Sequence, residues 1–155
     1  MAHDLAQMLR RKIDDNLPHL RALTDETAST PRGSDKWSAK QELGHLIDSA
    51  SNNHMRFVHA AIGPEFRGPS YQQESWVRVH RYEELPWETL VGFWSQYNLL
   101  LAHLVEGLSE ERLGGMCYIG SHPAAPLRHV VEDYAVHMQH HLDQLLRRDA
   151  ITQYP

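Results

Sequence analysis

The chain has 155 residues, the length of a single domain with one hydrophobic core, predicted to cover residues 1–155. Apolar residues make up 41% of it and charged residues 23%, with a formal net charge of −5, which is typical of a soluble globular protein and argues against a nucleic-acid partner. No stretch approaches the roughly 18 consecutive apolar residues of a membrane-spanning helix and no signal peptide is visible, so no membrane association is expected.

The first predicted helix extends from about Asp4 to about Ala28. Pro18 interrupts its pattern, so a kink or a break is expected there, because proline lacks the amide hydrogen that an interior helical position donates. The turn-forming residues at 29–35 predict a loop after it. The apolar residues that recur along one face of this helix are Leu5, Leu9, Ile13, Leu17 and Leu20.

The second predicted helix begins at Ser38 and ends at about Ile62. Ser38 and Gln41 have the spacing of a capping box, in which each side chain bonds the backbone amide of the other residue. Gly63 and Pro64 follow the last turn and are residues that commonly end a helix.

Two further helices are predicted in the second half of the chain. The third begins near Pro86, and its apolar face covers roughly half of the circumference once Phe93 and Leu100 are included. A face this broad predicts contact with two neighbouring helices or with a second subunit. The fourth runs from about Pro126 to about Arg148 and has the strongest helical periodicity in the chain, whereas strand alternation is weak everywhere.

These elements predict an all-α fold, a four-helix bundle. The connection at 63–85 is 23 residues long and that at 109–125 is 17, whereas antiparallel helix pairs use about 2–8. The first connection, extended at about 3.3 Å per residue, is long enough to run the length of the bundle and leave helices two and three parallel. It also carries side chains suited to a lid over a site, namely Tyr71, Trp76, Arg78, His80 and Arg81.

The chain is unusually rich in histidine, with 12 residues. His137 and His141 lie four residues apart on the apolar face of the fourth predicted helix, so both imidazoles point to the same side. Two imidazoles that converge from one helix make half or more of a metal site. The alternative is that each is a core histidine with its own hydrogen-bond partner, and the spacing alone leaves both open.

His45 lies on the second predicted helix, on the side opposite Leu43 and Leu46, and Asn52 and Arg56 follow it on that side. Periodicity alone favours a solvent-exposed face of an amphipathic helix. The alternative is a polar cavity, in which His45 is a metal ligand and Arg56 is a deep cation for an anionic substrate group.

The run Trp37-Ser-x-x-x-Glu-Leu-x-His45-Leu-Ile-Asp-Ser, followed by Arg56 and by the late pair His137-x-x-x-His141, resembles the DinB/YfiT-like superfamily over nearly the whole chain. The resemblance implies a four-helix bundle in up-down-down-up order, a homodimer, and a divalent metal, commonly zinc or nickel, bound by His45, His137 and His141. Known activities in that superfamily are thiol-dependent transfers and isomerisations that use bacillithiol, mycothiol or glutathione. Other members are described as metal-dependent hydrolases.

A metal with three histidine ligands keeps an open coordination position, as catalytic metals do. We therefore expect a metal-dependent enzyme acting on a small molecule, by thiol transfer with a low-molecular-weight thiol as cosubstrate, or by hydrolysis. The alternatives are a non-catalytic binding or stress-response module with a stabilising metal, and a protein without a metal. The candidate substrate contacts are Arg56, Asn52 and Tyr134.

Other catalytic sites have less support in the sequence. No glutamate follows His137, so the H-E-x-x-H motif of zinc proteases is missing, and Glu132 has the wrong spacing for the Glu-x-x-His motif of di-iron bundles. Cys117 is the only cysteine, which excludes an intrachain disulfide and favours a cytoplasmic location, and no base is identified that would activate it as a nucleophile. Members of the superfamily often have an acidic residue where this chain has Ala50, and Asp48 is the candidate to replace it.

Overall fold

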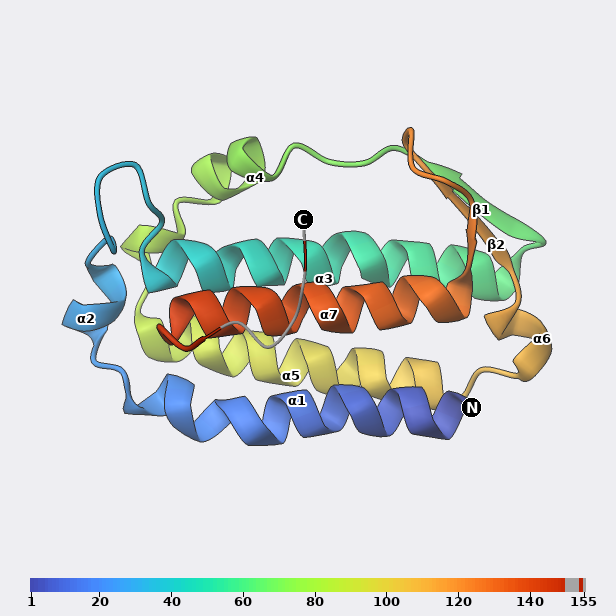
Figure 1. Ribbon diagram of the computed structural model, residues 1–155, viewed down its shortest axis with the longest axis horizontal. Coiled ribbons are helices and arrows are strands. Elements are labelled where there is room, and N and C mark those ends of the chain that lie inside the picture. Colours follow the sequence, from blue (N-terminus) through green and yellow to red (C-terminus); the bar gives the residue numbers. More distant parts are fainter. Residues whose placement is uncertain (150–153, 155) are drawn as a thin grey trace.

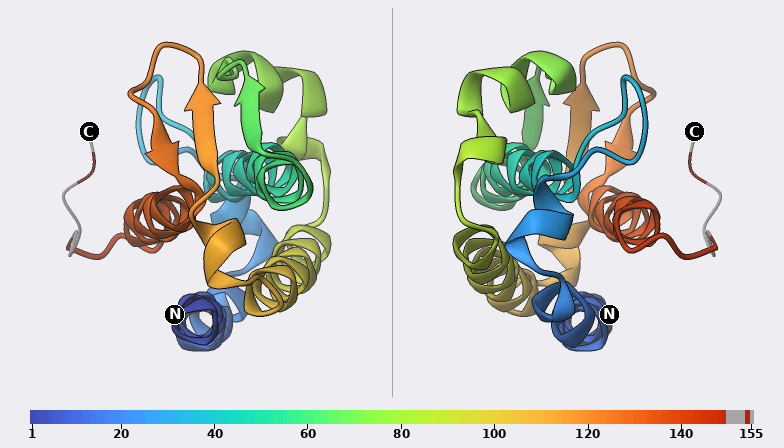
Figure 2. Two further views of the ribbon diagram at one scale, coloured as in Figure 1. Left: turned by 90° about the vertical axis from the view of Figure 1, so that its right-hand side faces the viewer. Right: turned by 90° about the vertical axis from the view of Figure 1, so that its left-hand side faces the viewer.

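The computed structural model describes residues 1–149 and 154 and shows a bundle of four long helices (Figure 1). Viewed along the bundle, α1 (Ala2–Ala22) lies beside α5 (Trp87–Glu106) and diagonally opposite α3 (Ala39–Ile62) (Figure 2). Each helix therefore packs against two others, which buries one broad face of each in a shared core. The four are α1 (Ala2–Ala22), α3 (Ala39–Ile62), α5 (Trp87–Glu106) and α7 (Leu127–Leu145).

The order of the helices is up-down-down-up, as the resemblance implied. Helices α1 and α7 run in one direction and α3 and α5 in the other (Figure 1). The chain between α3 and α5 returns along the whole bundle, so the predicted long crossover is confirmed. The crossover contains the short helix α4 (Gln73–His80) and the 3-10 turn η1 (Tyr82–Glu84).

Local capping sets the ends of the helices. The predicted capping box is present at the start of α3: Ser38 Oγ accepts a hydrogen bond from the Gln41 amide at 3.3 Å, and Gln41 Oε1 accepts one from the Ser38 amide at 3.0 Å. Gly63 follows the last residue of α3, as predicted. Helix α7 ends at Leu145, three residues before the predicted Arg148, and the chain turns into the left-handed region at Arg147 (φ 55°).

The first predicted helix is confirmed as far as Ala22, and the prediction that it continues unbroken to about Ala28 is wrong. Helix α1 ends at Ala22, Leu23 is extended, and Thr24 starts a separate short helix, α2 (Asp25–Ser29). Thr24 Oγ1 accepts a hydrogen bond from the Thr27 amide at 3.1 Å, so a new N-cap competes with continuation of α1. Pro18 lies inside α1, which continues past it for another turn.

A small sheet, which the sequence pattern did not predict, lies over α3 and α7 near one end of the bundle (Figures 1 and 2). Its strands β1 and β2 are parallel, with Phe66 opposite Cys117, and β3 pairs antiparallel to β2. Strands of two to four residues are too short to show alternation, which explains why they were missed. They are β1 (Glu65–Gly68), β2 (Met116–Ile119) and β3 (Ala125–Pro126), with helix α6 (Glu110–Leu113) before β2.

Helix α5 divides its apolar residues between the core and the outer surface. Trp94 and Leu101 are fully buried, whereas Phe93 is 54% exposed and Leu100 is 47% exposed. Part of the predicted broad face is thus not covered within one chain, and the homodimer stays a prediction. None of the helices in the described ranges combines the length and the hydropathy that crossing a bilayer requires.

Gly44 permits the close approach of the crossover to α3. A Cβ added at this position would lie 2.1 Å from the Tyr82 ring, whose hydroxyl donates a hydrogen bond to Asp48 Oδ1 at 2.6 Å. Because the anchored ring cannot move cheaply, we expect Gly44→Ala to lower the free energy of unfolding by about 1–3 kcal/mol. The control is Gly92→Ala in α5, where an added Cβ meets no atom within 4 Å. Gly92→Ala should raise the free energy of unfolding by about 0.5–1 kcal/mol. If urea unfolding gave the same change for both variants, the packing argument would be contradicted.

Candidate metal centre

Three histidines meet where α3 packs against α7. His45 Nε2 lies 3.1 Å from His137 Nε2, and one ligand nitrogen from each of His45, His137 and His141 lies within 4.8 Å of the others. Two nitrogens bound to one tetrahedral zinc at about 2.0–2.1 Å are about 3.3 Å apart. The structure therefore brings together the residues that the sequence analysis selected, in a donor set that fits a single divalent cation.

Burial keeps the first two histidines neutral. His45 is fully buried, so the cavity alternative, and not the solvent-exposed face, describes this side of α3. Burial, together with the neighbouring His141, lowers the pKa of His45 to about 3. Burial and the surrounding histidines likewise lower the pKa of His137 to about 2. Both imidazoles are thus unprotonated near neutral pH, the state that a metal ion requires.

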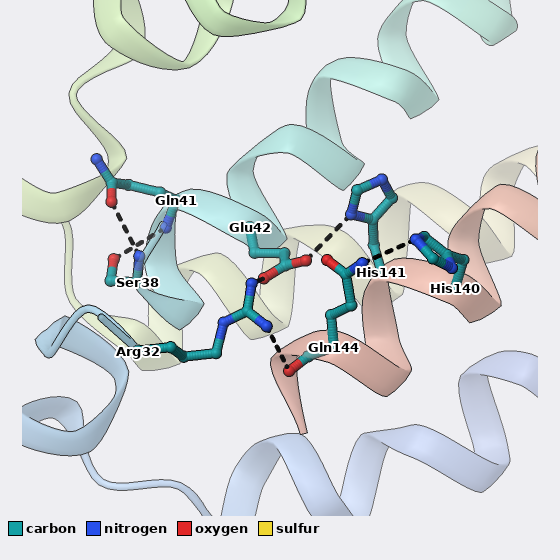
Figure 3. Close-up of polar contacts among 7 residues, drawn as sticks. All are labelled: Arg32, Ser38, Gln41, Glu42, His140, His141 and Gln144. Atoms are coloured by element: carbon teal, nitrogen blue, oxygen red, sulfur yellow. Dashed lines mark hydrogen bonds and ion pairs between the residues drawn. The ribbon is translucent and has the colours of Figure 1, made fainter. Parts of the chain in front are cut away.

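Glu42 orients the third histidine (Figure 3). Its Oε1 lies 3.1 Å from His141 Nδ1, and its Oε2 accepts a hydrogen bond from Arg32 Nη2 at 2.9 Å. Since a carboxylate only accepts, the hydrogen of this contact is on His141 Nδ1, which leaves Nε2 as the nitrogen available to a metal. A carboxylate on the far nitrogen of a histidine ligand is the usual support of a protein metal site. Glu42 is 1% exposed, so this contact is held inside the bundle.

The other polar groups nearby do not complete a fourth ligand position. His140 Nε2 lies 2.8 Å from Gln144 Nε2 (Figure 3), and Ser49 Oγ lies 3.5 Å from His137 Nδ1. In the described part of the chain, the cluster of metal-ligating side chains contains only the three histidines. A cation held there would keep at least one open position, as in catalytic sites.

Two of the three histidines, His137 and His141, line a cavity of about 710 Å³, within the usual size range of small-molecule sites. Arg56 and Tyr134 line this cavity, but the Tyr134 hydroxyl points away and donates to Asn98 Oδ1 at 2.5 Å. Asn52 does not line it; its side chain bonds the Asp48 carbonyl at 2.9 Å. The next residue, Asn53, lies about 100° further round the helix and does line the cavity.

The crossover covers part of the site. Tyr71 lines the cavity and packs edge-on against Trp76, with ring centroids 5.5 Å apart. Asp48, the candidate for the missing acidic residue, faces the crossover instead of the histidines, and its Oδ1 lies 3.1 Å from His80 Nδ1. Burial raises the pKa of Asp48. Its contacts with Tyr82 and His80 anchor the crossover to α3.

Comparison with known proteins agrees with this architecture. The family model of the DinB superfamily matches residues 8–145. The chain belongs to the DinB superfamily. A relative from Geobacillus thermodenitrificans (strain NG80-2), named "Putative metal-dependent hydrolase", is 25% identical over 127 residues, which are 80% of this chain and 70% of the relative. YfiT from Bacillus subtilis, a probable metal-dependent hydrolase with an unusual four-helix bundle topology, superposes with a TM-score of 0.84 at 17% identity, covering 94% of this chain and 84% of that one.

Three residues of this DinB-superfamily site were not assigned from the sequence. Glu42 lies three residues before His45 on the same helix, so its place in the Trp37 motif was the available signal. Nothing in the sequence distinguished Asn53 from its neighbour Asn52 as the residue that would line the cavity. Tyr154 packs against His137, with ring centroids 5.1 Å apart, and no local pattern places it there.

Proposed function

We propose that this DinB-superfamily chain is a metal-dependent enzyme that acts on a small molecule at a mononuclear site of His45, His137 and His141. The observation that carries the proposal is the convergence of three histidine nitrogens within 4.8 Å beside a cavity of about 710 Å³. A structural metal is normally enclosed by four protein ligands, whereas a catalytic one keeps a position for water or substrate. The non-catalytic alternative therefore has less support.

A divalent cation bound there would supply a Lewis acid and lower the pKa of a bound water or thiol. The residues of the chain do the rest. Glu42 holds His141 in the tautomer and orientation that a ligand needs. The cavity walls from α3, α7 and the small sheet position the substrate.

We favour transfer of a low-molecular-weight thiol to an electrophilic small molecule, because the cavity has room for two small reactants and three neutral donors suit a thiolate-binding zinc or nickel site. Hydrolysis is the second candidate. It is supported by the name of the Geobacillus relative, a metal-dependent hydrolase, and needs only that water take the position of the thiol.

Metal removal tests the proposal. The purified, untagged chain would be loaded with zinc or nickel and assayed with bacillithiol, mycothiol or glutathione against an electrophile such as chlorodinitrobenzene, and with p-nitrophenyl esters for hydrolysis. We expect chelation to lower the rate at least tenfold and stoichiometric metal to restore it. A rate indifferent to chelation contradicts the proposal. Stoichiometric metal with no turnover in any assay favours the non-catalytic module.

A further inference from the structure

Arg56 is a buried cation without a counter-charge. Its side chain is 9% exposed and lines the cavity. Within residues 1–149 and 154 its hydrogen bond goes to a neutral group, from Nη1 to Asn53 Oδ1 at 3.4 Å, and no carboxylate forms an ion pair with it. An unpaired charge is costly inside a protein, so a guanidinium kept in this position indicates an anion that arrives from outside.

The groups around Arg56 fit a planar anion. The Tyr71 ring centroid lies 5.9 Å from Arg56 Cζ, which supports the guanidinium from one face. Asn53 donates its amide hydrogens to Ser49 and presents only its carbonyl oxygen to Arg56, which leaves the other guanidinium donors free for a ligand.

The charges of the cavity also favour an anion over a cation. Among its described lining residues, Arg56 is the only arginine or lysine and Asp133 the only carboxylate. Asp133 lies beside Tyr154, and burial together with this neighbouring carboxylate raises the pKa of Tyr154 to about 12. Asp133 is exposed at the rim and therefore does not neutralise the deeper guanidinium.

Arg56 lines the same cavity as two of the three clustered histidines, His137 and His141. Arg56 follows His45 by eleven positions on α3, which places their Cα atoms about 16 Å apart along the helix axis. Long side chains on a helix lean toward its N-terminus, so the guanidinium lies closer to the histidines than its Cα does. Tyr154 packs on His137, and it is close enough to Arg56 for the guanidinium charge to act on its pKa. One side chain of the cavity wall thus lies near both the histidines and Arg56.

We propose that Arg56 binds a carboxylate of the substrate or cosubstrate while the reacting end of that molecule lies at the three histidines. The inference rests on the proposed function and adds the class of ligand: an elongated small molecule with a carboxylate at one end and its reacting atom at the other. A carboxylate matches one guanidinium through two parallel hydrogen bonds. A phosphate would call for further donors, such as a lysine or a nest of backbone amides, and the lining includes no lysine.

Binding, not turnover, tests this inference. The first probe pair is hexanoate and hexanamide, titrated calorimetrically into the zinc-loaded chain. The second pair is 6-mercaptohexanoate and 6-mercaptohexanol, followed by the thiolate absorption band of the cobalt-loaded chain. We expect each carboxylate to bind about tenfold or more tightly than its neutral partner. Among mercaptocarboxylates of three to eleven carbons, affinity should peak at an intermediate length.

Substitutions at Arg56 assign the preference. Arg56→Met, which keeps the length of the side chain and removes its charge, should abolish the carboxylate preference, and Arg56→Lys should retain part of it. The control is Arg128→Met, because Arg128 lies outside the cavity lining and pairs with Glu110 at 2.9 Å. Circular dichroism checks folding. If Arg56→Met does not fold, Arg56→Lys decides, because a carboxylate bound to the metal would keep its full preference in that variant.

Two results would overturn the inference: equal binding of the carboxylate and its neutral partner in the wild type, or an undiminished preference in a folded Arg56→Met. The second would mean that the carboxylate binds the metal itself. A chain that shows the preference but no turnover refutes the proposed function and leaves the anion site standing. An active chain that binds the carboxylate and its neutral partner equally refutes the anion site and leaves the proposed function standing.

Discussion

Replacing His141 with alanine should abolish stoichiometric metal binding and leave the helical bundle folded. The substitution removes one of three nitrogen donors, and two histidines hold a divalent cation far more weakly than three. We expect the dissociation constant for zinc to rise about a hundredfold or more, since a structural zinc site with four ligands contributes about 10–16 kcal/mol in total. The fold should survive because His141 lies at the cavity wall, with its side chain 14% exposed, and not among the fully buried core residues.

The measurement is elemental analysis of untagged protein after dialysis, with a zinc titration and a circular dichroism spectrum beside it. His140→Ala is the matched control, because His140 is the adjacent histidine on α7 and bonds Gln144 instead of facing the other two donors. This variant should keep one equivalent of metal. Full metal content in His141→Ala would refute the site, and loss of metal in both variants would indicate a closed site with four ligands.

Glu42→Gln should weaken metal binding without removing a ligand. The amide keeps the shape of the side chain but no longer offers a carboxylate to His141 Nδ1 and Arg32 Nη2. Loss of such a supporting carboxylate typically reduces metal affinity about 10–100-fold. The metal-free protein should also lose about 1–3 kcal/mol of stability, because Arg32 is left without its buried partner.

The control for Glu42→Gln is Lys40→Met, which breaks a different ion pair near the start of α3. Lys40 Nζ lies 3.1 Å from Asp25, and its side chain is 5% exposed, yet it does not contact the histidines. Urea unfolding should show a loss of stability in both variants, whereas the zinc titration should change only in Glu42→Gln. Unchanged zinc affinity in Glu42→Gln would show that the carboxylate serves the fold alone.

The sequence alone determined the features that depend on neighbours within about four residues. Ser38 and Gln41 specified the start of α3 through a capping box, and the spacing of His137 and His141 placed both on one face of α7. The length of the crossover, a property of the chain and not of neighbouring residues, predicted parallel second and third helices. In each case the determinant is local geometry, which a helix or a linker imposes wherever it is placed.

Only the tertiary structure decided which faces meet. His45 and His137 are 92 residues apart and Glu42 and His141 are 99, and their contacts depend on how α3 and α7 are rotated about their axes when they pack. Periodicity placed His45 opposite the apolar stripe but did not show that this side closes over a cavity. The same rotation selects Asn53 instead of Asn52 for the cavity wall, because one residue turns a helical side chain through about 100°.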